Sequence, residues 1–167
     1  RAGAMLRPAL EKTLTAFEAR EGVRISRSYN GCGILVAEMQ AGDHTDVFFA
    51  CDTEFMGMAA DLFGPSAVLS SNQLVILVRK GNPHKIKTLG DLGRRKGLRV
   101  GIGHEKQCAM GVLTQRTLKA DGSGDAVMKN VVVQSPTGDL LVNQMLAGSL
   151  DAAVAYITNA AGHADRL

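Results

Sequence analysis

The chain has 167 residues, of which 46% are hydrophobic and 21% charged, close to the average of globular proteins. This composition excludes disordered and collagen-like classes, and no apolar run approaches the roughly 20 residues of a transmembrane helix. The formal net charge of +3, from 19 Lys and Arg against 16 Asp and Glu, is mild and spread along the chain. Aromatic residues make up only 4%, with no Trp, so a nucleic-acid partner is not expected.

Both ends of the sequence indicate a part of a longer protein. The segment Arg1–Met5 has no initiator Met and no signal peptide, and a helix is predicted to follow almost at once. The chain stops at Leu167, shortly after another predicted helix start. We expect this chain to be the ordered or mature part of a longer protein. An export signal that had been removed would not be visible in this sequence.

The first part of the chain is predicted to alternate helix and strand. Pro8 suits the first turn of a helix that Gly22 ends, because Leu10, Leu14 and Phe17 recur on one face. Apolar and polar residues then alternate as in a half-buried strand. The elements predicted after the first helix are a strand over 23–26, a helix over 34–40, a buried strand over 46–50 and a helix over 53–62.

The second part of the chain continues the alternation. Its predicted strands are 73–78, 99–102, 131–133 and 151–156, and its predicted helical segments are 88–92, 108–119 and 138–147. Strands spaced by helices in this way imply βαβ units and parallel sheets. The sequence therefore predicts an α/β protein, and it contains no internal repeat.

Five loops precede predicted helices, and four of them follow predicted strands, where ligands of α/β proteins bind. Several helix N-termini aimed at one place would hold a small anion through backbone N–H groups, without Arg or Lys. Neither Gly31–Gly33 nor Gly101–Gly103 completes a phosphate-loop or dinucleotide motif, so no nucleotide cofactor is expected. The five loops are 4–5, 30–33, 51–52, 103–110 and 135–138.

One of these loops carries a resemblance to a known family. Residues 46–52 read Asp-Val-Phe-Phe-Ala-Cys-Asp, which resembles the Asp-Val-Phe-x-Ser-Ala-Asp segment of the periplasmic molybdate-binding proteins of ABC transporters. The similarity covers nearly the whole chain, because further matching segments follow in the family's order. They are 7–10, 29–33, 74–83 and 148–161.

The resemblance implies a two-lobed type II periplasmic-binding-protein fold, in which each lobe is a mainly parallel sheet flanked by helices. The lobes of this fold close on a ligand. By the resemblance, residues 1–71 form the first part of lobe 1, residues 72–156 form lobe 2, and residues 157–167 begin the return to lobe 1.

The function that the resemblance implies is binding without catalysis. The protein is expected to capture a small oxyanion of the molybdate or tungstate type in the cleft between the lobes, in the periplasm or another extracytoplasmic space. It would then present the closed form to a membrane permease, its only link to the membrane. No cofactor is required, and recognition needs only a higher affinity of the closed state for the ligand.

The family's binding residues carry over unevenly. Tyr156 matches the Tyr whose hydroxyl donates to the oxyanion, and Gly138 falls where a backbone N–H at a helix N-terminus contacts the ligand. Ala4-Met5 stand where the family has Ser-Ser, Cys32 replaces the Ser of the second loop, and Ala50-Cys51 replace the Ser-Ala of the third. A thiol is a weaker hydrogen-bond donor than the hydroxyl it replaces.

The only three cysteines of the chain, Cys32, Cys51 and Cys108, all lie in or beside the predicted ligand loops. They are either small buried apolar side chains, two of which could form a disulfide, or a site for a soft ion. Three thiolates suit Cu(I), Zn(II) or a trigonal metalloid such as arsenite. In this alternative, the residues that could add ligands are Met5, Met110 and His104.

Two further classes of function are considered. A ligand-sensing effector domain of a regulator shares the two-lobe fold, so it stays an alternative to a transport receptor. A thiol enzyme is not expected, because no third group is predicted to orient His104 beside Cys108. Asp52 is predicted to cap the helix that begins at residue 53 rather than to act in acid–base chemistry. The histidines predicted to be solvated are His44, His84 and His163.

Overall fold

The computed structural model describes residues 1–167, which divide into two compact units, Arg1–Val68 and Leu69–Leu167. The predicted lobe limits at 71 and 156, and a return of residues 157–167 to lobe 1, stay predictions. None of the helices combines the length and the apolar character needed to cross a lipid bilayer.

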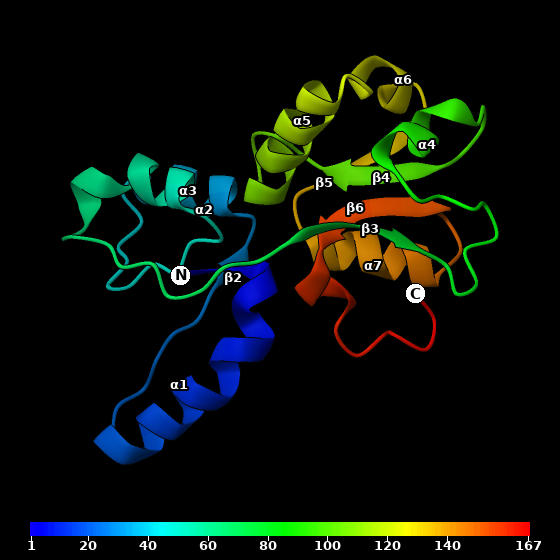
Figure 1. The fold of residues 1–167 in the computed structure, drawn as a ribbon. Helices are drawn as coiled ribbons and strands as arrows, with labels where there is room; N and C mark the ends of the chain where they lie inside the picture. Colours follow the sequence, from blue (N-terminus) through cyan, green and yellow to red (C-terminus); the bar gives the residue numbers. More distant parts are fainter. The chain divides into compact units, whose positions relative to one another are not determined.

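The first unit is built on three short, parallel stretches of extended chain. Strand β1 (Ala2–Gly3) pairs with β2 (Tyr29–Asn30), and Ala2 also forms a parallel bridge to Phe49. Each stretch leads into helical structure, and α2 packs against α3 (Figure 1). The helical elements are η1 (Ala4–Leu6), α1 (Arg7–Glu21), α2 (Cys32–Gln40), α3 (Thr53–Met58) and η2 (Ala60–Leu62).

The helices of this unit largely follow the predicted ones. Pro8 lies in the first turn of α1, and Gly22 ends the helix with a φ of 65°, which glycine adopts without a steric penalty. Helix α2 begins two residues before its predicted start. The helix predicted over 53–62 is divided into α3 and η2 at Ala59.

The strand predicted over 23–26 is wrong, because this segment lies in irregular backbone. The N–H of Ile25 donates to Glu18 Oε1 at 2.6 Å, and the guanidinium of Arg27 pairs with the carboxylates of Glu11 and Glu18. These bonds tie the segment to α1. Residues 23–26 therefore have the residue pattern of a strand but no neighbouring strand with which to pair.

The strand predicted over 46–50 is reduced to the single bridge at Phe49. Val47 is 56% exposed, so the apolar run is not buried on both sides as predicted. Phe48 is buried, and its ring stacks on that of Phe63 with 6.2 Å between the centroids. Backbone hydrogen bonds between Phe49 and residues 1 and 3, together with the packing of Phe48, hold this segment in the unit.

The second unit contains a four-stranded sheet whose strands the sequence predicts. Their order across the sheet is β3-β6-β4-β5; β4 runs parallel to both β5 and β6, whereas β3 is antiparallel to β6. The strands are β3 (Leu74–Val78), β4 (Val100–Gly103), β5 (Val131–Ser135) and β6 (Ala152–Tyr156).

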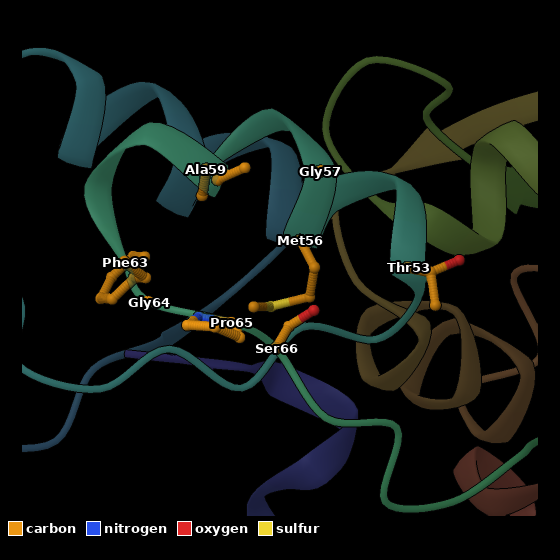
Figure 2. Close-up of a pocket in the computed structure, with 9 residues that line it drawn as sticks. Thr53, Met56, Gly57, Ala59, Phe63, Gly64, Pro65 and Ser66 are labelled. Atoms are coloured by element: carbon orange, nitrogen blue, oxygen red, sulfur yellow. The ribbon is translucent and has the colours of Figure 1, made fainter.

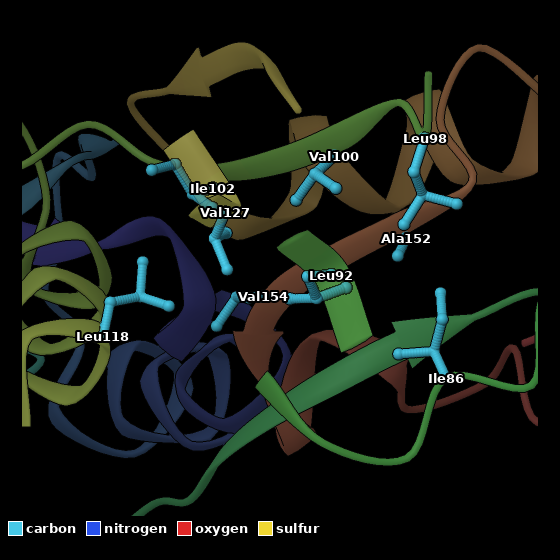
Figure 3. Packing of buried hydrophobic residues seen from close by; sticks show 9 residues of the cluster. All are labelled: Ile86, Leu92, Leu98, Val100, Ile102, Leu118, Val127, Ala152 and Val154. Carbon is cyan, nitrogen blue, oxygen red and sulfur yellow. The ribbon is translucent and has the colours of Figure 1, made fainter. Parts of the chain in front are cut away.

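Helices cover both faces of this sheet (Figure 1). Val100 and Ile102 of β4 point to one face, where they pack in an apolar cluster with Leu92, Leu118 and Val127 from α4, α5 and α6 (Figure 3). The intervening Gly101 faces α7: a Cβ there would lie 2.8 Å from Leu141 of that helix. The helical elements are α4 (Leu89–Arg94), α5 (Ala109–Asp121), α6 (Gly124–Met128), α7 (Gly138–Leu146) and η3 (Ile157–Ala160).

Candidate functional site

The predicted ligand loops of the first unit lie together at the carboxyl ends of its extended stretches. The N–H of Gly3 donates to the carbonyl of Phe49 at 2.9 Å, and Gly3 also pairs with Asn30 in the β1–β2 ladder. The residues that follow these stretches are the predicted site residues Ala4, Met5, Cys32 and Cys51.

Cys32 and Cys51 are in direct contact. Their Sγ atoms lie 3.1 Å apart, and the backbone N–H of Cys51 donates to Cys32 Sγ at 3.2 Å. Cys32 is 1% exposed, whereas Cys51 is half-buried. Hydrogen bonding with the side chain and the backbone N–H of Cys51 lowers the pKa of Cys32, while burial and the nearby Asp52 carboxylate oppose it.

Gly3 makes this contact between the thiols possible, and the sequence interpretation did not include it. A Cβ at Gly3 would collide with Cys51 Sγ and would lie 2.9 Å from Cys32 Sγ. Both sulfur atoms therefore occupy the space that a side chain at position 3 would need. The only signal in the sequence is a glycine directly before Ala4, which by itself indicates nothing specific.

Asp52 caps α3, as predicted. Its Oδ1 accepts hydrogen bonds from the backbone N–H groups of Glu54 at 3.0 Å and Phe55 at 3.1 Å. These two donors are thus bonded to a carboxylate of the protein. The oxyanion prediction for the 51–52 loop therefore depends on other groups of that loop.

In the second unit, the predicted site residues lie at one edge of the sheet. Strands β4, β5 and β6 are parallel, so their carboxyl-terminal residues Gly103, Ser135 and Tyr156 end at the same edge. Cys108 precedes α5, which follows β4, and Gly138 begins α7, which follows β5. The structure thus brings together the loops of Cys108, Gly138 and Tyr156.

Cys108 is packed tightly into this edge. It is 6% exposed, and its thiol donates to the carbonyl of Ser135 at 3.5 Å. A Cβ at Gly103 would lie 2.9 Å from Cys108 Sγ, so the glycine admits the sulfur. Met110 is 2% exposed, and its role as an additional metal ligand stays a prediction.

Asn159 organises the turn at Gly138, and sequence reasoning missed it. It is 7% exposed; its Oδ1 accepts from the N–H of Tyr156 at 3.2 Å, and its Nδ2 donates to Asp139 Oδ1 at 3.0 Å. A Cβ at Gly138 would collide with this amide. Asn159 therefore connects the N-terminus of α7 with the end of β6 that carries Tyr156.

The predicted metal site of three cysteines stays a prediction, because its residues are divided between the two units. Cys32 and Cys51 lie together in the first unit, whereas Cys108 belongs to the second. No group of three His, Cys, Asp or Glu side chains is arranged to hold a metal ion. His104, the other predicted ligand, accepts a hydrogen bond from the N–H of Lys106 at its Nδ1, 3.2 Å away.

One of the histidines predicted to be solvated instead belongs to an ion cluster around the buried carboxylate of Asp151. His84 Nε2 lies 3.6 Å from Asp151 Oδ1, and the imidazole is only 27% exposed. Arg99 donates to both oxygens of Asp151, at 3.1 and 2.8 Å, and lowers the pKa of this carboxyl to about 2. Asp151 precedes β6, so the cluster lies at the opposite end of that strand from Tyr156. His44 is exposed, as predicted.

The first unit also contains a pocket of about 340 Å³ beside α3 (Figure 2). Met56, Phe63 and Pro65 line it, and its polar side chains are the hydroxyls of Thr53 and Ser66. None of the predicted ligand-binding residues lines this pocket, and it has no cationic side chain. It is therefore distinct from the site that the loops form.

Comparisons with known proteins agree with the resemblance found in the sequence. A family model described as bacterial extracellular solute-binding protein matches residues 1–167. The molybdate-binding protein ModA of Mycobacterium tuberculosis is 29% identical over 163 residues, which are 95% of this chain. The chain spans about 60% of the length of this curated relative.

Solved structures confirm the predicted fold class. The periplasmic molybdate-binding protein of Azotobacter vinelandii superposes with a TM-score of 0.74 at 17% identity, covering 95% of this chain and 71% of that one. The sulfate-binding protein SubI of Mycobacterium tuberculosis gives 0.72 at 19% identity, covering 93% and 62%. The fold is therefore the two-lobed type II fold of periplasmic binding proteins.

Proposed function

The chain belongs to the bacterial extracellular solute-binding protein family, and from this we propose that it captures a small oxyanion for an ABC transporter. The proposed ligand is of the molybdate or tungstate type, the proposed compartment is the periplasm or another extracytoplasmic space, and the proposed partner is a membrane permease. The 29% identity to ModA over 95% of the chain supports this ligand type.

The observation that carries the proposal is the common edge of three parallel strands in the second unit. Helices α5 and α7 both begin at this edge, and the first N–H groups of a helix have no partner within the helix. Such N-termini favour an anion through their dipoles. Asn159 fixes the turn at Gly138 beside Tyr156, so donors from two elements are held in one arrangement.

The first unit is proposed to contribute mainly backbone donors. Cys32 begins α2, a helix of 9 residues, and replaces the hydroxyl that the family has in this loop. Its sulfur already contacts Cys51, so the Cys32 thiol is a poor substitute for the Ser hydroxyl of the second loop. Ligand contacts of Ala4, Met5, Cys32 and Cys51, and a ligand position in the cleft between the lobes, stay predictions.

The choice among tetrahedral oxyanions follows from the strength of each similarity. ModA shares 29% of its aligned residues with this chain, whereas SubI shares 19% and shows the fold alone. We therefore place molybdate and tungstate ahead of sulfate. All three are doubly charged tetrahedral anions, so the difference between them lies in size and in the hydrogen bonds that the site can make.

Calorimetric titration of the full chain with sodium molybdate, tungstate and sulfate tests this proposal. We expect binding of one molybdate or tungstate per chain, and weaker binding of sulfate. Ligand at 100 times its Kd should stabilise the fold by about 2.7 kcal/mol, which raises the melting temperature by roughly 5–10 °C. Absence of heat and of a thermal shift with all three anions would contradict the proposal.

A further inference from the structure

The contact between Cys32 and Cys51 is a property of the first unit alone. Cys32 is the first residue of α2, and Cys51 precedes Asp52, the N-cap of α3. The pairing of Gly3 with Asn30 and its hydrogen bond to Phe49 fix the two turns that carry the cysteines. The two thiols are thus held 3.1 Å apart by backbone bonds on both sides.

This distance suits a bond between the sulfur atoms better than a shared metal ion. Zn–S bonds of about 2.3 Å at tetrahedral angles would hold the sulfurs about 3.8 Å apart. A disulfide needs an approach of the two Sγ atoms from 3.1 Å to about 2.05 Å, a change of about 1 Å. The absence of any group of three metal-ligating side chains points the same way.

The two thiols differ in exposure, and this difference assigns each of them to one step of disulfide formation. Cys51 is half-buried, so an oxidant can reach it, whereas Cys32 is 1% exposed. Cys32 lies in the first turn of α2; its thiol donates to Cys51 Sγ, and its sulfur accepts from the N–H of Cys51. The bond from the Cys32 thiol favours a thiolate at Cys51 for the first step, and the helix N-terminus and the N–H of Cys51 stabilise a thiolate at Cys32 for the second.

We propose that Cys32 and Cys51 are a redox-active pair that closes to an intramolecular disulfide by exchange with a disulfide oxidant. The Cys51 thiolate attacks one sulfur of the oxidant, and the oxidant's other half leaves as a thiolate. Cys32 then attacks Cys51 Sγ in the mixed disulfide and expels the second thiolate. The pair loses two protons and two electrons, and the oxidant is reduced to two thiols.

Formation of the disulfide does not require oxyanion binding, although the pair lies at the predicted ligand loops. A disulfide would join the turn before α2 to the turn before α3, and so restrict the unfolded chain between positions 32 and 51. We expect the oxidised chain to melt about 5–10 °C higher than the reduced one. It would also replace two thiol groups at the loops with a bridge that donates no hydrogen bond.

Intact-mass and peptide-mapping measurements on the full chain test the proposal. The reduced chain is incubated with glutathione disulfide, and the expected product has lost two hydrogens and contains a 32–51 link. The Cys108→Ser variant is the matched control and should form the same link, because Cys108 lies in the other unit. A chain that keeps three alkylatable thiols, or links Cys108 instead, overturns the proposal.

Two single variants test the order of the steps. Cys32→Ser should accumulate glutathione on Cys51, since no second thiol resolves the mixed disulfide. Cys51→Ser should react at least tenfold more slowly at position 32, because Cys32 is buried. Equal labelling of both variants, or protection of the wild-type thiols by one equivalent of Zn²⁺, would contradict the pair as described. The intact-mass measurement on the wild-type chain requires no variant, so it tests the disulfide even if a variant does not fold.

Discussion

Asn159 and Gly138 form the most constrained contact of the candidate site. The Asn159 amide bonds to Tyr156 and Asp139 and occupies the space that a Cβ at Gly138 would take. We expect Gly138→Ala to push the amide away, to destabilise the fold by roughly 1–3 kcal/mol and to weaken oxyanion binding at least tenfold. Calorimetry and urea unfolding measure the two effects.

Gly90→Ala is the matched control for this variant. Gly90 lies in the first turn of α4 in the same unit, and a Cβ there would meet its nearest atoms at 3.8 and 3.9 Å, ordinary contact distances. The control should keep both stability and affinity. Equal affinity of the Gly138→Ala and Gly90→Ala variants would contradict the placement of ligand beside α7.

Asp151 makes the stability of the second unit depend on acid pH. Hydrogen bonds from Arg99 lower the pKa of its carboxyl from 3.8 to about 2, and its side chain is 9% exposed. Because the folded pKa is the lower one, this stabilisation of about 2 kcal/mol is complete above about pH 4 and is lost as the pH falls towards 2.

Asp151→Asn should remove this acid-dependent component. The urea midpoint of unfolding is measured at pH values from about 5 to about 2, a range that spans the folded and unfolded pKa values of Asp151. It should fall more steeply for wild type than for the variant. The variant is also less stable near neutral pH, because Arg99 loses its carboxylate partner. Asp165→Asn, on an exposed side chain, should retain the wild-type profile.

At the scale of elements, α3 depends on its cap. Asp52 Oδ1 accepts from two N–H groups of the first turn, and the helix has only 6 residues. We expect Asp52→Ala to destabilise the first unit by about 1 kcal/mol. Asp52→Asn keeps a side-chain acceptor and should restore most of that loss in urea unfolding. If Asn proved no better than Ala, the cap would not be the reason for the effect.

The elements that the sequence predicts best are the strands of the sheet in the second unit. The runs that become β3, β4, β5 and β6 are apolar and bounded by glycine or polar turns, so periodicity and length suffice to identify them. Residues 23–26 have an equally good alternation, yet Glu18 and Arg27 hold the segment on α1. A local pattern does not specify whether a neighbouring strand is available.

The candidate site was only partly predictable for a related reason. Resemblance to the family predicts Gly138 and Tyr156 as site residues, and the order of strands and helices predicts the loops that carry them. The contact between Cys32 and Cys51 depends on pairing between segments of two residues, which carry no periodicity. Asn159 lies after the last strand as a single polar residue, and only the fold shows that its amide reaches Asp139.

At the scale of the whole molecule, the central claim is that the chain is a receptor for a molybdate-type oxyanion. The family match over residues 1–167 supports a solute-binding protein, and each unit gathers its predicted loops at the carboxyl ends of parallel strands. The thiols at Cys32 and Cys51, where the family has hydroxyl and small residues, distinguish this chain within that scheme.

A crystal structure of the full chain grown with tungstate tests this claim most directly, because tungsten is located by its anomalous scattering. We predict one tungsten site, with an oxygen of the anion accepting a hydrogen bond from the N–H of Gly138 and another from the hydroxyl of Tyr156. Tungsten bound only elsewhere on the chain, or no tungsten at saturating tungstate, would contradict the account.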